Sequence, residues 1–210
     1  MSTLIAIPSM DEVPAVFAQA LSMLEKVDET AVAFQIGSLV YTSRNALAKK
    51  AIEMDADYVL WLDSDMVFEP SLLKDMRQTM QERDIDMLCG AYFKRVAPYT
   101  PVLFDELKID GNYCKYHSME DMPPGDDLFK VDACGFGCVL MRADVIFSVI
   151  SKHAQTFNPI NGVGEDLSFC WRARECGYDI WCDPTIKLGH CGRAIITRDF
   201  FNAYRGAKNA

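Results

Sequence analysis

The sequence contains no apolar run near the ~20 residues that a membrane-spanning helix needs. Its N-terminus carries no positively charged region, and Pro8 interrupts the short apolar stretch there, so the pattern of a secretory signal is missing. Basic residues are also few, with 21 Lys and Arg against 30 Asp and Glu, for a formal net charge of −9. Most of such a surface repels nucleic acid and anionic membranes, although a local basic patch would still bind them. We expect a cytoplasmic protein with no membrane span.

Three common site signatures are missing as well. No G-x-G-x-x-G follows the first expected strand and no G-x-x-x-x-G-K-[ST] occurs, which disfavours dinucleotide-binding and P-loop proteins. The eight cysteines form no Cys-x-x-Cys pair, and most lie inside apolar stretches. Reduced, buried cysteines acting as small hydrophobic residues fit this pattern best. A zinc site is the alternative, with the ligands Cys134, Cys138, Cys182 and Cys191.

The first half of the chain alternates strand-like and helix-like segments. Strands are expected at 4–8, 32–35, 58–62 and 87–93, and helices at 13–27, 43–54 and 70–83. Ser43 is the expected N-cap of the second helix. This order predicts a mainly parallel sheet with helices on both faces.

The second half is less regular but shows no linker and no repeat. Residues 100–127 are expected to form hairpin and loop, followed by two strand-like pieces around Gly135-Phe136-Gly137. Helices are expected at 143–156 and 166–176, the second ended by Gly177, and short strands at 178–182 and 186–188. The 210 residues, half of them hydrophobic, suit a single domain with one shared core.

One of three Asp-x-Asp triplets stands out by its position. The triplets at 55–57 and 84–86 precede strands, whereas Asp63-Ser64-Asp65 directly follows the apolar run YVLWL. It therefore lies at the carboxyl edge of the expected sheet, where open α/β sheets bind ligands. Two carboxylates there favour Mg²⁺ or Mn²⁺, which can bridge diphosphate oxygens. A solvated turn after a strand is the alternative.

Two later motifs carry further candidates. Gly164-Glu165-Asp166 opens an expected helix, where an acidic pair is also ordinary N-terminal capping. His190 follows a short expected strand, and a lone histidine is commonly structural. An imidazole that joins two carboxylates would favour Mn²⁺ over Mg²⁺.

Taken in order, the segments IPSMDE, SRNALAKKA, YVLWLDSDMVF, CGFGCVLMR and GEDLSFCWRARECGYDIWCDPTIKLGH resemble GT-A-fold glycosyltransferases, closest to the family 2 type. The resemblance spans most of residues 3–190. It implies a three-layer α/β/α fold with a mostly parallel central sheet and a small hairpin in the C-terminal half. It also implies one domain over 1–210, with a nucleotide-binding half (about 1–95), an acceptor and catalytic half (about 96–192) and a basic, aromatic tail (193–210).

The resemblance also implies a set of donor-binding residues. The nucleotide would contact Pro8, Ser9, Asp11, Glu12, Arg44 and Asn45, and Arg44-Asn45 would orient the acidic motif. Asp63, Ser64 and Asp65 would meet the metal and the diphosphate, with Asp65 as the direct metal ligand and His190 completing the metal set. Gly135 and Gly137 would let the backbone approach the donor sugar, with a hairpin bulge as the alternative.

Asp166 matches the acidic residue that deprotonates the acceptor hydroxyl in inverting members, and Glu165 beside it could fill that role. The chain lacks the Gln-x-x-Arg-Trp signature of processive members, so polymer synthesis is not expected. The resemblance thus implies transfer of one sugar from a nucleoside-diphosphate sugar, UDP first and GDP next, with Mn²⁺ or Mg²⁺. The acceptor stays open between a saccharide, a protein and a modified nucleic acid.

Other functions remain as alternatives. A nucleotidyltransferase would need a glycine-rich loop that IPSMDE does not offer. A non-catalytic sugar-nucleotide or carbohydrate-binding module would keep the fold without turnover. A phage-type enzyme that glycosylates hydroxymethylated DNA bases could use the tail, whose basic residues Arg193, Arg198, Arg205 and Lys208 alternate with Phe200, Phe201 and Tyr204. That tail forms either a lid that reaches an anion or a surface helix whose aromatic side chains dock on the core. Lys94-Arg95 could likewise touch phosphate or be solvated.

Overall fold

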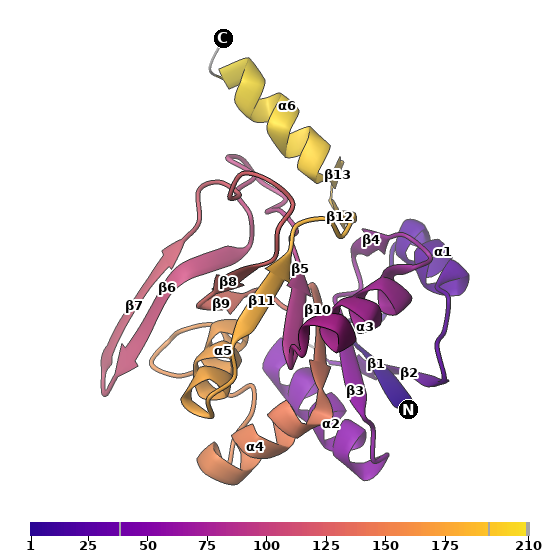
Figure 1. Ribbon diagram of the computed structural model, residues 1–210, viewed down its shortest axis with the longest axis vertical. Coiled ribbons are helices and arrows are strands. Elements are labelled where there is room, and N and C mark those ends of the chain that lie inside the picture. The colour runs from indigo at the N-terminus through magenta and orange to yellow at the C-terminus, as the bar shows by residue number, and fades with distance from the viewer. Residues whose placement is uncertain (38, 193, 209–210) are drawn as a thin grey trace.

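The computed structural model describes residues 1–37, 39–192 and 194–208 (Figure 1). Its largest element is a seven-stranded sheet in the order β2 (Glu29–Ile36), β1 (Ser2–Ser9), β3 (Tyr58–Leu62), β10 (Cys138–Arg142), β5 (Met87–Gly90), β11 (Ile180–Asp183) and β8 (Phe129–Val131). Within this sheet β10 and β8 run antiparallel to their neighbours, and the other strands share one direction. The expected α/β fold with a mostly parallel sheet is confirmed.

Helices pack against both faces of this sheet. The cluster that contains Val59 and Trp61 of β3 includes residues of α2 (Val40–Glu53), α4 (Ala143–His153) and α5 (Glu165–Glu175). The cluster that contains Leu60 and Leu62 includes residues of α1 (Ala15–Met23) and α3 (Leu72–Arg83). Successive side chains of a strand point to opposite faces, so a strand covered on both sides must be apolar throughout. This requirement accounts for the uninterrupted run YVLWL.

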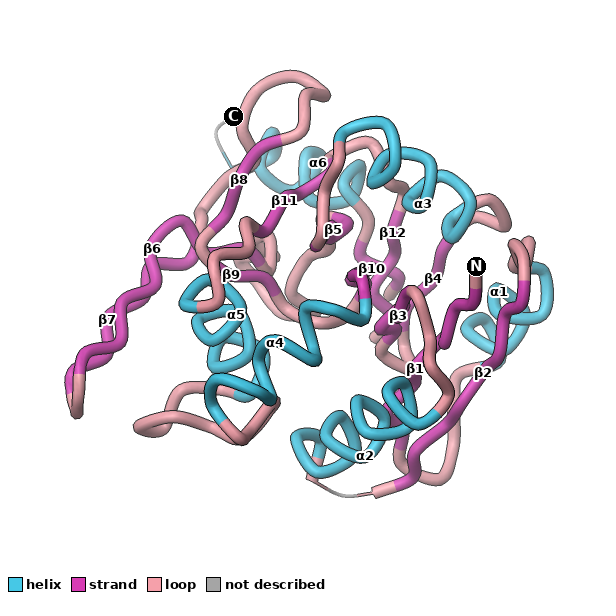
Figure 2. Tube along the Cα trace, turned by 60° about the horizontal axis from the view of Figure 1, so that its bottom comes forward, coloured by secondary structure: helices cyan, strands magenta, loops and turns pink. Residues whose placement is uncertain are grey.

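Two smaller sheets flank the main one. The first joins β4 (Met66–Phe68), β12 (Leu188–Cys191) and β13 (Ile195–Ile196), and it pairs His190 with Met66. The second joins β9 (Ala133–Cys134) to the hairpin of β6 (Leu103–Asp110) and β7 (Tyr113–Ser118), which extends away from the central sheet (Figure 2). The last helix, α6 (Arg198–Lys208), projects from the body beyond β13 (Figure 1).

Several local expectations are wrong. The helix expected at 13–27 covers only Ala15–Met23, and the strand expected at 87–93 ends at Gly90. The second helix begins at Val40 rather than Ser43, and Ser43 is buried within it, where its hydroxyl lies close to Gly37. Ser43 therefore packs against the preceding connection instead of capping the helix. The last short strand covers Leu188–Cys191 rather than 186–188, because its pairing with β4 begins only at Leu188. Gly177 ends α5 as expected, with a positive φ of 95°.

The cysteines are free thiols, as expected. Five of them are buried, and burial raises the pKa of the Cys138 thiol to about 12, so it stays protonated. Across the described ranges no three or more His, Cys, Asp or Glu side chains are grouped to hold a metal ion, so the structure gives the zinc alternative at Cys134, Cys138, Cys182 and Cys191 no support. None of the helices that the structure describes combines the length and apolarity needed to cross a membrane.

A cluster of three phenylalanines supports the start of α5. Phe169 is fully buried, stacks on Phe157 with 4.5 Å between ring centroids, and meets Phe136 edge-on at 5.3 Å.

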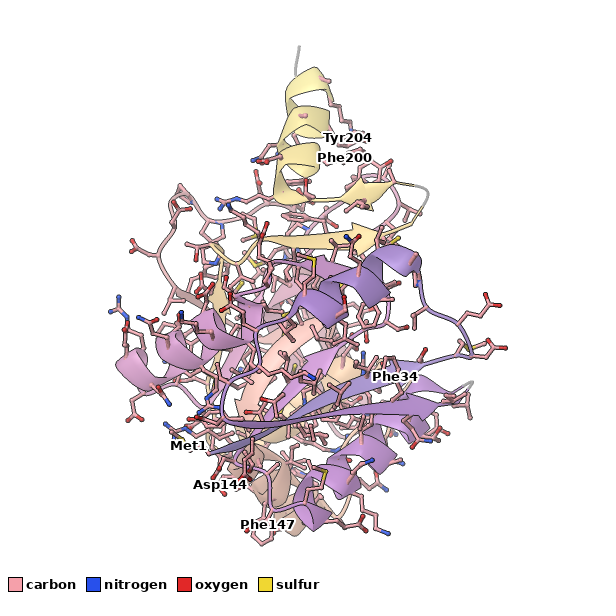
Figure 3. All side chains as sticks on the ribbon, turned by 90° about the vertical axis from the view of Figure 1, so that its right-hand side faces the viewer. Met1, Phe34, Asp144, Phe147, Phe200 and Tyr204 are labelled. Carbon is pink, nitrogen blue, oxygen red and sulfur yellow. The ribbon has the colours of Figure 1, made fainter. Side chains whose placement is uncertain are left out.

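We predict that Phe169→Ala lowers the free energy of unfolding by about 3–5 kcal/mol, because it leaves a cavity under the helix. The matched control is Phe147→Ala on α4, where the ring is 61% exposed (Figure 3) and the loss should stay within about 0.5 kcal/mol. Equal losses in chemical denaturation would contradict this account of the core.

Candidate functional site

The acidic loop, which consists of Asp63, Ser64 and Asp65, lies between β3 and β4, where the strand order predicts it. The backbone amide of Asp63 donates to the carbonyl of Gly137 at 3.1 Å, and the amide of Cys191 donates to the carbonyl of Asp65 at 2.8 Å. The loop is therefore tied to the segment before β10 on one side and to β12 on the other. These ties bring chain segments from both halves of the sequence to the carboxyl end of β3.

Arg44 of α2 is the centre of this arrangement. Its guanidinium donates to Asp63 Oδ1 at 2.7 Å and to Glu165 Oε1 at 2.6 Å, and its side chain is only 3% exposed. It also lies over the ring of Phe136, 5.2 Å from the centroid. Burial lowers the pKa of Arg44, but the surrounding carboxylates of Asp63, Glu165 and Asp166 outweigh burial and raise it. Arg44 thus stays charged and fixes two of the candidate carboxylates.

Asn45, next to it, fixes the loop that leads to α5. Its Oδ1 accepts hydrogen bonds from the amide of Phe157 at 2.9 Å and from the hydroxyl of Thr156 at 2.5 Å, while its Nδ2 donates to Asn158 at 3.0 Å. Both polar atoms of the amide are therefore used within the protein. The structure gives Asn45 a positioning role, and Arg44 the contact with the acidic motif.

Asp65 meets two basic side chains. Its Oδ2 lies 2.7 Å from Nη1 of Arg95 and 3.5 Å from Nε2 of His190. Nδ1 of His190 lies 2.8 Å from the carbonyl oxygen of Phe93, which can only accept, so Nδ1 carries a proton and donates it. Burial raises the pKa of Asp65, but the hydrogen bond and charge of His190, together with Arg95, outweigh burial and lower it. Asp65 is therefore ionised.

The fit of a divalent cation rests on this pair. No described residues form a ready set of three metal-ligating side chains. Asp65 and His190 nevertheless offer a carboxylate oxygen and an imidazole nitrogen 3.5 Å apart, the two donor types that suit Mn²⁺. Oδ1 of Asp63 is instead bound to Arg44. Of the three expected metal ligands, the structure brings together Asp65 and His190 and turns Asp63 toward Arg44.

Asp166 lies in the first turn of α5 and differs from its neighbour Glu165. Glu165 is bound to Arg44, whereas Asp166 has only the amide of Leu167 as a partner, at 2.8 Å from Oδ1, among the described residues. Burial, and next the negative charge of Glu165, raise the pKa of Asp166 to about 6. A carboxylate that titrates near neutral pH can accept a proton from a substrate. The contacts therefore favour Asp166, the residue that the resemblance indicates, over the alternative Glu165.

Tyr92 explains the two glycines of the CGFGC segment. A Cβ added at Gly137 would lie 2.7 Å from Cζ of Tyr92, and one at Gly135 would collide with its hydroxyl. The buried Tyr92 ring also packs edge-on against His190, with 5.3 Å between centroids. The glycines make room for this ring; their contact with a donor sugar stays a prediction. Sequence reasoning missed Tyr92, because paired glycines signal a close neighbour without saying which one.

The remaining candidates lie apart from these contacts. Pro8 and Ser9 are buried at the end of β1, Asp11 and Glu12 are exposed just beyond it, and Ser64 is half-buried in the acidic loop. A cavity of about 710 Å³ is lined by parts of α1, β4, β12 and the start of α6, but by none of Asp63, Asp65, Asp166 and His190. We therefore assign it no role in the site.

The tail forms helix α6, and its N-terminal part packs on the body of the protein through Phe201. Phe201 of α6 stacks on Phe93 at 4.8 Å. Arg198 pairs with Asp126 at 3.2 Å, and Arg205 pairs with Asp121, so acidic residues of the loop between β7 and β8 neutralise both cations. This arrangement fits the surface-helix interpretation better than a lid that reaches an anion. Arg193 and residues 209–210 lie outside the described residues.

Comparison with known proteins supports the fold alone. No protein-family model matches the sequence, and no curated protein matches it. Among solved structures, the crystal structure of A197 from STIV superposes with a TM-score of 0.67 at 19% sequence identity. The match covers 95% of this chain and 91% of that chain.

The raised pKa of Asp166 predicts how the free energy of unfolding changes with pH. Between about pH 4 and pH 6 the folded protein keeps a proton on Asp166 that the unfolded chain, with the ordinary pKa of 3.8, has lost, so rising pH destabilises the fold there. We predict that Asp166→Asn raises the free energy of unfolding by roughly 2 kcal/mol at pH 8 and by little at pH 4. Asp144→Asn, an exposed aspartate in the first turn of α4 (Figure 3), is the matched control without this gain. A gain that is the same at both pH values would contradict the raised pKa.

Proposed function

We propose that the protein is a metal-dependent glycosyltransferase with a GT-A-like three-layer fold of the family 2 type, acting in the cytoplasm. It would move one sugar from a nucleoside-diphosphate sugar, a UDP-sugar first, to an acceptor hydroxyl. The observation that carries this proposal is that Arg44 joins the acidic loop to the start of α5, and that each of these two segments carries an acidic group of a different character. Asp65 is ionised and faces His190, whereas Asp166 titrates near neutral pH and has no ion pair of its own among the described residues.

Each residue of the site has a separate role in the proposed reaction. Asp65 and His190 would hold the divalent cation, which supplies positive charge to the departing diphosphate. Asp166 would take the proton of the acceptor hydroxyl as the acceptor oxygen forms its bond to the sugar carbon. The bond between that carbon and the diphosphate breaks, and its electron pair leaves with the nucleoside diphosphate. Arg44 holds Asp63 and Glu165 in fixed positions, so these two carboxylates do not have to reorganise during the reaction.

The charge distribution bears on the acceptor. The two tail arginines that would contact a nucleic acid, Arg198 and Arg205, are already paired with Asp126 and Asp121. A saccharide or protein hydroxyl therefore suits the site better than a modified DNA base. Carboxylates with a raised pKa cluster at catalytic sites, so the environment of Asp166 favours an enzyme over a non-catalytic binding module.

Donor binding tests the proposal directly. We predict that UDP with Mn²⁺ raises the melting temperature by about 5 °C or more at 100 times the dissociation constant, because a ligand of the folded state stabilises it. UDP alone should give a smaller shift, and GDP, CDP and TDP serve as comparisons. Asp65→Asn should remove the Mn²⁺-dependent part of the shift. Asp55→Asn, in a different Asp-x-Asp triplet, should keep it. No shift with any nucleoside diphosphate would refute the proposed function.

Turnover tests the role of Asp166. We predict that Asp166→Asn lowers donor-to-acceptor transfer by about 10²-fold or more while UDP and Mn²⁺ still bind, because the amide cannot accept the acceptor's proton. The measurement is sugar transfer from the donor that gives the strongest stabilisation, in parallel with calorimetric binding of UDP. Full activity in Asp166→Asn would remove the general base from the mechanism.

A further inference from the structure

A second basic side chain, that of Arg95, is paired with the carboxylate of Asp65 in the proposed metal site. Arg95 follows β5, and its Nη1 lies 2.7 Å from Asp65 Oδ2. The same oxygen faces Nε2 of His190 at 3.5 Å. The oxygen that a divalent cation would bind is thus already neutralised by a guanidinium.

The surroundings of Arg95 are shaped for this contact. Gly192 lies along its stem, and a Cβ there would be 3.2 Å from Cδ of Arg95 and 3.4 Å from Cγ. The side chain of Arg95 is 50% exposed, whereas that of Asp65 is 23% exposed. Half of the Arg95 side chain already meets solvent, so its guanidinium can leave Asp65 without coming from a buried position.

The backbone that carries Arg95 is held on both sides. Before it, the carbonyl of Phe93 accepts from His190, and the ring of Phe93 stacks on Phe201 of α6. After it, the ring of Tyr99 lies edge-on against Phe200 and Tyr204, at 5.0 and 4.9 Å. Figure 3 shows Phe200 and Tyr204 on α6. The amide of Lys94 also donates to the carbonyl of Thr100 at 3.0 Å, which closes the loop that carries Arg95. Because this backbone is held, the guanidinium of Arg95 would leave Asp65 by rotation of its own side chain.

We propose that Arg95 is the resident cation of the donor-free site. It neutralises Asp65 until a divalent cation takes its place, and the released guanidinium then binds the diphosphate of the donor. A guanidinium pairs with phosphate oxygens through parallel hydrogen bonds, and from this position it stands beside the metal that the same diphosphate must reach. This inference rests on the proposed function, since it concerns the same metal and donor.

The first experiment measures Mn²⁺ binding by calorimetry without any nucleotide. Arg95→Met removes the charge and keeps an unbranched stem along Gly192, and we expect it to bind Mn²⁺ about fivefold more tightly than the wild type. Arg95→Lys retains a cation and should stay near the wild type. Lys94→Met is the matched control, because Lys94 donates to Ser118 instead of an acidic residue. Adding Asp65→Asn to Arg95→Met should abolish the gain, which places the metal at Asp65.

The second experiment measures UDP binding at saturating Mn²⁺. Arg95→Met should now bind about tenfold more weakly, because the diphosphate loses a charge-assisted partner. Opposite signs in the two experiments distinguish this role from a general loss of structure, which would weaken both. Unchanged Mn²⁺ affinity in Arg95→Met overturns the inference, and so does unchanged UDP affinity. If the wild type and Arg95→Met bind both ligands equally well, the inference fails while the proposed function stands. If neither variant binds UDP or Mn²⁺, both fail.

Discussion

A buried guanidinium sets the geometry on which the site depends. Arg44 is nearly inaccessible to water, and its two carboxylate partners come from segments 19 and 121 residues away along the chain. A charge buried in this way is tolerated only when it is paired and hydrogen-bonded, so the three segments must meet in one arrangement. The cation holds Asp63 and Glu165 and leaves Asp65 and Asp166 free to differ. The chemical contrast between these two groups has other causes: burial is outweighed at Asp65 by His190 and Arg95, which lower its pKa, whereas burial and the charge of Glu165 raise that of Asp166.

Much of the fold could be predicted because it depends on local patterns. The uninterrupted apolar run of β3 marks a strand covered on both faces, and the acidic triplet after it marks the carboxyl edge. Contacts between distant segments could not be predicted. Nothing near Asp63 in the sequence indicates that Arg44 binds it, and nothing near Gly135 and Gly137 identifies Tyr92. The three-residue strand β4 was missed, because so short a run has no detectable periodicity.

Two departures from a simple parallel order bring the site residues together. β10 lies between β3 and β5 and runs against both, which places Gly137 beside the acidic loop. The small sheet then pairs β12 with β4, which places His190 next to Asp65. The raised pKa of Asp166 is unfavourable for the folded state at neutral pH. A fold that retains such a group is consistent with a chemical role for it, because a residue that served only stability would not need it.

The amide of Asn45 has a consequence for how substrates could enter. Through Thr156, Phe157 and Asn158 it fastens the loop before α5 to the helix that carries Arg44. In the proposed enzyme, these hydrogen bonds would join the segment expected to bind the nucleotide directly to the segment expected to bind the acceptor, which disfavours a hinge between the two. For the proposed glycosyltransferase, we therefore expect the order in which donor and acceptor bind to depend on side chains and surface loops at the rim of the site, and not on closure of two lobes.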